Sequence, residues 1–173
     1  MSRWFALYSQ TGSELLSICE ELRIHPDAII TNNPITRNVF LNAQYATHEE
    51  IMEWLKETLE PDDIVTLHGY LRIIPEEVIE TGARIYNGHP GLITMYPELK
   101  GKDPQKKVEQ NRAKYKHVGS VIHEVTGEVD AGRVVRVSMR RLYPHDRVTE
   151  VLRGMSLELW VNFLKEELYV EVN

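Results

Sequence analysis

The first ninety residues alternate short β-branched and apolar runs with longer segments whose apolar residues recur at helical spacing. The short runs, which predict strands, cover residues 4–9, 27–31, 64–67 and 83–87. Helical patterns cover residues 15–22, residues 51–59 and the segment that Pro75 begins. Because repeated strand and helix units build parallel sheets, this alternation predicts an open, mostly parallel sheet with helices on both faces.

The last third of the chain changes character. Residues 118–125 and 133–141 form two strand-like runs, and the seven residues between them are within the length range of a hairpin. We therefore expect these two strands to pair antiparallel. A helix is expected over residues 104–115, and a long amphipathic pattern over residues 148–164 predicts a terminal helix that covers one face of the sheet.

Length and composition limit what this sheet can belong to. The chain has 173 residues, 42% of them hydrophobic and 27% charged, which predicts a single globular domain over residues 1–173. Its one cysteine, Cys19, excludes a disulfide framework and a thiolate-rich zinc site. No apolar stretch is long enough for a signal peptide or a membrane span, so we expect a soluble, cytoplasmic protein. The net charge of −6 disfavours general nucleic-acid binding.

Two Thr-x-x-Glu patterns precede helical segments, at Thr11 and at Thr47. In a capping box of this kind, the threonine and glutamate side chains bond to each other's backbone amides at the start of a helix. We expect a box at both places. At the first one, however, Gly12 follows a strand, so the same amides could instead hold a phosphate. Between these two patterns we expect loop over residues 35–46, with a candidate short strand at residues 39–41.

One stretch carries the side chains that are best suited to catalysis. In Asn87-Gly-His89, an amide and an imidazole lie two residues apart at the end of a predicted strand, so both project to one side. Pro90 and Gly91 then end the strand. A carboxylate, Asp130, lies in a loop between two glycines. These three groups could polarise a carbonyl and move a proton. Each also fits a structural role, as a turn, a strand end or an Asx turn.

These motifs resemble the folate-dependent formyltransferases, and within that group the glycinamide ribonucleotide formyltransferases. The matching segments are Asn87-Gly-His-Pro-Gly-Leu92, Tyr96-Pro-Glu-Leu-Lys-Gly101, His117-Val-Gly-Ser-Val-Ile-His-Glu-Val125 and Glu128-Val-Asp-Ala-Gly-Arg-Val-Val135. The resemblance extends from about Phe5 to Phe163. It implies a Rossmann-like formyltransferase fold, an α/β sheet that ends in an antiparallel strand pair. It also implies a one-carbon transferase of purine biosynthesis, which uses 10-formyltetrahydrofolate as co-substrate and no metal.

The resemblance also implies roles for particular residues. Catalysis would rest on Asn87, His89 and Asp130. The folate pocket would be formed by Leu71, Arg72, Ile73, Ile74, Val125, Gly127 and Val129. The acceptor would contact Gly12, Ser13, Glu14, His123 and Lys102. For His123, which is centred in a predicted buried strand, a core histidine is an equally good reading. The seven histidines include no His-x-x-x-His pair on a helix, which disfavours a zinc site.

Three departures from the family pattern bear on the acceptor. Glu14 stands where the ribonucleotide enzymes have asparagine. The segment over residues 32–47 is shorter than in those enzymes. The segment over residues 100–116 is longer and more basic than theirs, with a local net charge of +5. This basic segment is either a solvated helix face or an anion-binding patch. The acceptor is therefore open between glycinamide ribonucleotide, an amino-sugar nucleotide and another small amine. Monomer and homodimer are both compatible with the chain.

Two other functions use the same residues. A hydrolase would release formate from 10-formyltetrahydrofolate with water as the acceptor. A non-catalytic module of the same fold would bind folate or a nucleotide without turnover. The presence of all three catalytic residue types weakens the reading as a non-catalytic module, whereas the hydrolase would use the same site as the transferase.

Overall fold

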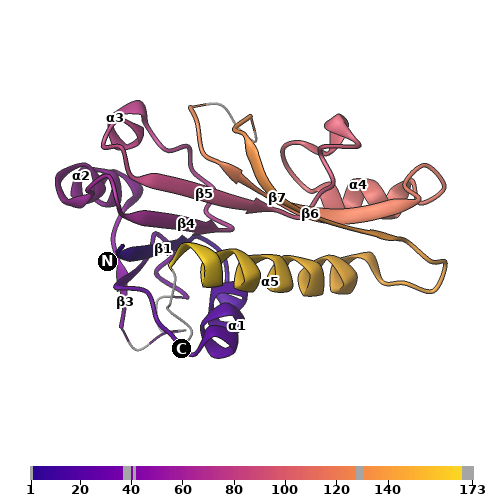
Figure 1. Cartoon of the computed structure of the whole chain (residues 1–173), viewed down its shortest axis with the longest axis horizontal. Coiled ribbons are helices and arrows are strands. Elements are labelled where there is room, and N and C mark those ends of the chain that lie inside the picture. The colour runs from indigo at the N-terminus through magenta and orange to yellow at the C-terminus, as the bar shows by residue number, and fades with distance from the viewer. Residues whose placement is uncertain (1, 37–39, 41, 128–130, 169–173) are drawn as a thin grey trace.

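The computed structural model describes residues 2–36, 40, 42–127 and 131–168 (Figure 1). In chain order its elements are β1 Trp4–Tyr8, α1 Ser13–Leu22, β2 Ala28–Thr31, β3 Ala43–Tyr45, α2 His48–Thr58, β4 Ile64–His68, α3 Glu76–Ile79, β5 Arg84–His89, the 3-10 helix η2 Pro97–Leu99, α4 Pro104–Gln110, β6 His117–Glu124, β7 Val134–Arg141 and α5 Val148–Glu167. No helix in the described part of the chain combines the length and apolar character that a membrane crossing requires.

The described strands form one sheet in the order β3-β2-β1-β4-β5-β6-β7. The five strands from β3 to β5 are parallel, whereas β6 runs antiparallel to both β5 and β7. The chain leaves β1 toward β2 on one side and returns to β4 on the other, so the strand order reverses between β1 and β4. This arrangement confirms the predicted mostly parallel sheet with an antiparallel C-terminal pair.

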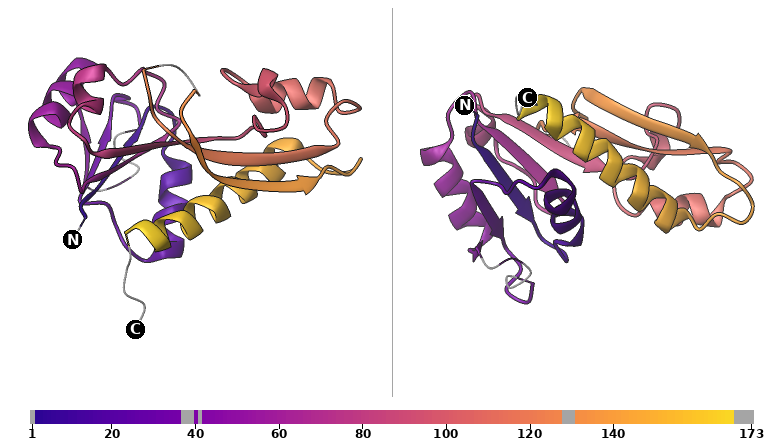
Figure 2. Two further views of the ribbon diagram at one scale, coloured as in Figure 1. Left: turned by 45° about the horizontal axis from the view of Figure 1, so that its top comes forward. Right: turned by 60° about the horizontal axis from the view of Figure 1, so that its bottom comes forward.

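Helices cover both faces of the sheet, as predicted (Figure 2). On one face α1 and α5 pack on alternate strand residues, among them Trp4, Tyr8 and Tyr86. On the other face α2 and α3 pack on the residues between, such as Phe5 and Ile85. A third cluster joins α4 and the first turns of α5 to β6. Because strand side chains alternate between faces, these clusters fix the face to which each remaining strand residue points.

Most predicted elements agree with the structure within three residues at each end. The exceptions are the segment over residues 35–46 and the helix over residues 104–115. The segment predicted as loop contains β3, which is only three residues long and mostly exposed, so it lacks an alternating apolar pattern. Of the candidate strand at residues 39–41, only Phe40 is described, and it lies in a bend. The helix predicted over residues 104–115 ends at Gln110. Tyr115 instead follows a turn over residues 111–114 and is buried, and its ring contacts that of Tyr96 at 4.9 Å between centroids.

The two Thr-x-x-Glu patterns behave differently. At Thr47 the capping box is confirmed, because both reciprocal hydrogen bonds with Glu50 are present at 3.2 Å. At Thr11 the prediction of a box is wrong. Gly12 is the residue that caps α1, with φ of 72°, and no side chain caps the helix. The Glu14 carboxylate turns away from the backbone and contacts His68.

Candidate active site

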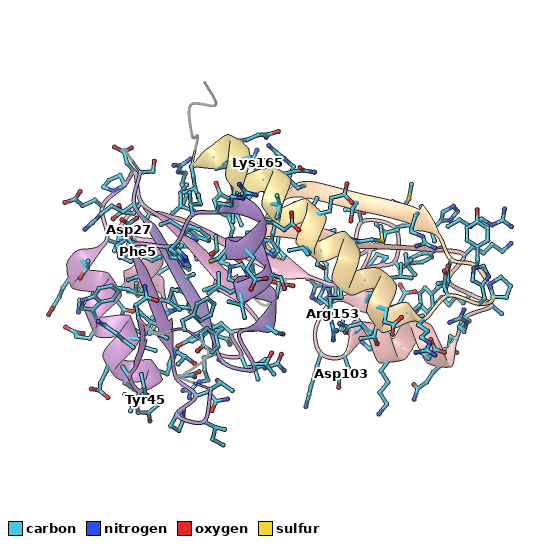
Figure 3. All side chains as sticks on the ribbon, turned by 90° about the horizontal axis from the view of Figure 1, so that it is seen from below. Phe5, Asp27, Tyr45, Asp103, Arg153 and Lys165 are labelled. Carbon is cyan, nitrogen blue, oxygen red and sulfur yellow. The ribbon has the colours of Figure 1, made fainter. Side chains whose placement is uncertain are left out.

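A cavity of about 1120 Å³ opens at the carboxyl ends of β1, β4 and β5. Ligands in open α/β sheets bind at this edge, where the strand order reverses. The lining comprises residues 10–14, Ser17, residues 67–74, residues 87–90, residues 101–105, His123, Val125, Thr126, and seven residues of α5 between Thr149 and Leu157. Figure 3 shows Arg153 on α5 and Asp103 ahead of α4 in the same region of the molecule. The cavity therefore collects segments from almost the whole chain.

Asn87 and His123 meet across neighbouring strands at the wall of this cavity. They are paired in the antiparallel register of β5 and β6, and Asn87 Nδ2 lies 3.4 Å from His123 Nε2. The other ring nitrogen, Nδ1, lies 3.0 Å from the Glu124 carbonyl oxygen, which only accepts, so Nδ1 carries a proton. His123 is buried, as expected of a core histidine, yet it lines the cavity, as expected of a ligand contact. The burial of His123 and its place in the cavity wall are therefore compatible with both roles, a core histidine and an acceptor contact.

His89 ends β5 and is 5% exposed. Its Nε2 donates to the Leu99 carbonyl oxygen at 2.7 Å, so the remaining nitrogen, Nδ1, donates only when the ring is an imidazolium. Gly91 makes room for this ring, because a Cβ there would lie 3.1 Å from His89 Nε2 and 3.0 Å from Pro104 Cβ. The Ser120 hydroxyl donates to the His89 carbonyl oxygen at 3.0 Å and holds the strand end in place.

The third predicted catalytic residue, Asp130, lies outside the described residues, as does Val129. The ends of their loop are described. Val125 N donates to the Ile85 carbonyl oxygen at 2.9 Å, and a Cβ at Gly132 would lie 1.6 Å from the Glu124 carbonyl oxygen, so only glycine fits there. Gly127, predicted to contact folate, does not line the cavity.

The remaining predicted folate contacts lie on the loop after β4 and at Val125, and all of them line the cavity. Leu71 and Ile73 are largely exposed, whereas Ile74 is buried. Two contacts hold this loop to α2: Tyr70 donates its hydroxyl to His48 Nδ1 at 2.6 Å, and Arg72 pairs with Glu49 at 3.4 Å. Burial raises the pKa of Tyr70 and lowers the pKa of His48, so both groups are neutral at pH 7.

The predicted acceptor contacts Gly12, Ser13, Glu14 and Lys102 also line the cavity. Sequence reasoning assigned no role to His68, whose position immediately after a buried β-branched run was the available signal. It also missed the polar residues of α5, such as Arg153, because a helical pattern does not say what its polar face borders. No group of three or more His, Cys, Asp or Glu side chains suited to a metal ion occurs in the described ranges.

Several residues of the basic segment have structural partners. Arg112 donates to the carbonyl oxygens of Tyr143, Pro144 and Asp146, which fixes the turn before α5. Lys114 pairs with Glu98 at 2.7 Å, and Lys107 donates to the Glu98 carbonyl oxygen. These contacts favour the reading of the segment as a structural, solvated surface for most of its length, with Lys102 at the cavity as the exception.

Comparisons with known proteins identify the family of this chain. Residues 12–159 match the family described as formyl transferase. The chloroplastic phosphoribosylglycinamide formyltransferase of Arabidopsis thaliana is 34% identical over 113 residues, and the mitochondrial formyltetrahydrofolate deformylase 2 of the same plant is 29% identical over 106 residues. These matches cover 64% and 61% of this chain but only 36% and 30% of the two relatives, so the chain spans about a third of their length.

Among solved structures, the phosphoribosylglycinamide formyltransferase of Bacillus halodurans superposes with a TM-score of 0.79 at 20% identity, covering 97% of this chain and 96% of its own. This likeness shows the same fold over almost the whole chain. The family match covers most of the chain and includes the cavity wall with Asn87, His89 and His123. The chain belongs to the formyl transferase family.

Proposed function

We propose that this protein transfers the formyl group of 10-formyltetrahydrofolate to the amine of a small-molecule acceptor. The observation that carries the proposal is that Asn87 and His89 share the wall of a cavity of about 1120 Å³ in a chain of this family. Cavities that bind drug-sized ligands typically measure about 300–1,000 Å³, so there is room for a folate and an acceptor together.

The loop after β4 suits the folate. Leu71, Ile73 and Ile74 offer apolar surface, and the loop's attachment to α2 presents its backbone groups in a fixed arrangement. A flat heteroaromatic ring that makes several hydrogen bonds needs this combination of apolar walls and fixed polar groups. The deep side of the cavity, toward β5, would then receive the formyl group.

The proposed chemistry uses the side chains of Asn87 and His89. The acceptor nitrogen attacks the formyl carbon, a C–N bond forms, and the carbonyl oxygen becomes an oxyanion. Asn87 donates to that oxyanion through Nδ2. His89 also donates to it through Nδ1 as an imidazolium, since its Nε2 proton is held by Leu99. The bond to the folate nitrogen then breaks, and the proton lost by the amine passes to that leaving nitrogen.

We include Asp130 in this mechanism on the strength of its sequence motif. A carboxylate near His89 would favour the imidazolium form that the Leu99 hydrogen bond makes necessary for donation. No side chain in the motif forms a covalent intermediate, so the transfer is direct. The relatives' names point to phosphoribosylglycinamide as one acceptor to test. The deformylase among them keeps hydrolysis as the second candidate.

Tetrahydrofolate release tests the proposal. The protein is mixed with 10-formyltetrahydrofolate and a panel of amines that includes glycinamide ribonucleotide, its dephosphorylated riboside and amino-sugar nucleotides. Release that depends on an amine supports the transferase. Release without any amine identifies the hydrolase, and binding without release identifies a non-catalytic module. In Asp130→Asn we expect turnover to fall at least about a hundredfold with folding intact, and a loss under about tenfold would remove Asp130 from the mechanism.

A further inference from the structure

The helix α1 contributes a carboxylate, Glu14, to the wall of the cavity. Glu14 lies in the first turn of this helix, its side chain is 36% exposed, and its Oε1 lies 3.1 Å from His68 Nδ1. The His68 side chain is only 1% exposed, and its ring contacts that of Trp160 with 4.7 Å between centroids. His68 is thus held rigidly in the core while Glu14 borders the cavity.

A chain of hydrogen bonds runs from Trp4 through Thr66 to His68. Trp4 Nε1, which only donates, lies 2.8 Å from Thr66 Oγ1, and that oxygen lies 2.7 Å from His68 Nε2. The arrangement is satisfied when Thr66 accepts from Trp4 and donates its own proton to His68 Nε2. His68 then holds its proton on Nδ1 and donates it to Glu14.

This wall therefore has a defined chemistry. An ionised carboxylate has about four acceptor positions and no donor, and His68 occupies one of them. A ligand group placed beside Glu14 must donate hydrogen bonds, as a hydroxyl group does. A phosphate group would bring only acceptors and negative charge, and would be repelled. The helix N-terminus by itself would favour an anion, but the carboxylate in its first turn already supplies one.

Glu14 and the proposed reaction centre border one cavity from opposite faces of the sheet. His68 points to the face covered by α1 and α5, as its contact with Trp160 shows, whereas Asn87 points with Ile85 to the other face. A molecule whose amine reaches Asn87 would extend its remaining atoms around the strand ends toward Glu14.

We propose that Glu14, positioned by His68, selects an acceptor whose tail bears hydroxyl groups and carries no phosphate. This inference rests on the proposed formyl transfer and names the acceptor class for it. Glu14 is the specificity-determining contact, and His68 is a positioning residue.

A matched pair of probes tests the inference: glycinamide ribonucleotide, which ends in a phosphate, and glycinamide riboside, which ends in a hydroxyl. We expect kcat/KM for the riboside to exceed that for the ribonucleotide at least tenfold, and Glu14→Gln to reduce this ratio at least tenfold. Glu20→Gln, an equal charge change on the exposed side of the same helix, should leave the ratio unchanged. His68→Gln should raise KM for the riboside much more than it lowers kcat.

Preference for the ribonucleotide, or a ratio that Glu14→Gln does not change, would overturn the inference. In that case Lys102 and Arg153, which line the same cavity, would be the phosphate contacts, and their glutamine variants would lose the ribonucleotide. The same comparison by calorimetric binding in the presence of tetrahydrofolate does not need turnover. If no amine in the panel is formylated, the proposed function fails. Riboside binding that Glu14→Gln weakens would still support this contact, and failure of both probes to bind would reject it.

Discussion

At the residue scale, the glycine between the two proposed catalytic side chains is as constrained as they are. Gly88 points to the face opposite Asn87 and His89, where the Trp160 indole of α5 lies directly over it. A Cβ at this position would be 2.5 Å from Trp160 Nε1, which is closer than packed atoms approach. Because Trp160 is 1% exposed, the ring has no space into which to move. The missing side chain lets α5 close on the strand that carries the site.

We predict that Gly88→Ala destabilises the protein by about 1–3 kcal/mol, the usual cost of an overpacked core, and also lowers turnover because β5 must shift. Urea unfolding measures the first effect and tetrahydrofolate release the second. Gly154→Ala is the matched control. Gly154 is an exposed residue inside α5, and a Cβ there would meet no neighbouring side chain within 4 Å, so the change should stabilise the helix by about 0.5–1 kcal/mol. Equal stability of the two variants would contradict this account.

At the scale of elements, the two Thr-x-x-Glu patterns show what local sequence can and cannot decide. At Thr47 the pattern leads straight into a helix, and nothing competes for the two side chains, so the local prediction is right. At Thr11 the backbone turns through Gly12 at positive φ, and His68 binds the glutamate. Glu14 and His68 are 54 residues apart in the chain, so no local sequence pattern could predict this contact.

We predict that Thr47→Ala lowers the free energy of unfolding by about 1 kcal/mol, because the Glu50 amide loses its cap. Thr11→Ala is the comparison, since the hydroxyl of this exposed threonine bonds only to its neighbour Ser13, to the amide at 3.2 Å and to the hydroxyl at 2.8 Å, where water can replace it. Its loss should cost less than about 0.5 kcal/mol. Both values come from chemical denaturation of the two variants. If Thr11→Ala lowered the free energy of unfolding more than Thr47→Ala does, Thr11 would have to cap α1 after all.

The same distinction explains how far the fold and the site followed from the sequence. Buried strands such as β1 and β4 are continuous apolar runs, and their periodicity alone places them within two residues. β3 depends on its neighbour β2 for its definition, and α4 ends early because Tyr115 packs against Tyr96. The motif residues Asn87 and His89 were identifiable from their order in the chain. The approach of His68 and α5 to the cavity depends on tertiary packing and was not.

At the scale of the whole molecule, one end of the sheet borders the cavity and the other end contributes to stability. The carboxyl ends of β1 and β4 border the cavity, whereas their amino ends are joined by a partly buried ion pair. Asp63, just ahead of β4, accepts two hydrogen bonds from Arg3 at 2.7 and 2.9 Å and a third from the Glu60 amide at 2.7 Å. Burial alone would raise the pKa of Asp63, but these donors outweigh it and hold the pKa below its ordinary value.

This lowered pKa predicts how stability depends on pH. Asp63 binds its proton less readily in the folded chain than in the unfolded chain, so it contributes stability above the unfolded pKa of about 4. That contribution is lost as the pH falls through the lower folded value. We therefore expect Asp63→Asn to melt at a lower temperature than the wild type at pH 7, and the difference to shrink between about pH 5 and pH 3. Thermal unfolding followed by circular dichroism across this range measures it.

Asp62→Asn separates the ion pair from a general charge effect, because Asp62 is exposed and its substitution removes the same charge one residue earlier. Its melting temperature should follow that of the wild type at every pH. Since Asp63 lies at the end of β4 away from His68, the Asp63→Asn variant that remains folded at pH 7 should keep its KM for both substrates. A difference in melting temperature that persists undiminished at pH 3 would mean that Asp63 stabilises the fold without being ionised. An altered KM would mean that the two ends of the sheet are coupled through β1 and β4, and acid would then weaken substrate binding before it unfolds the protein.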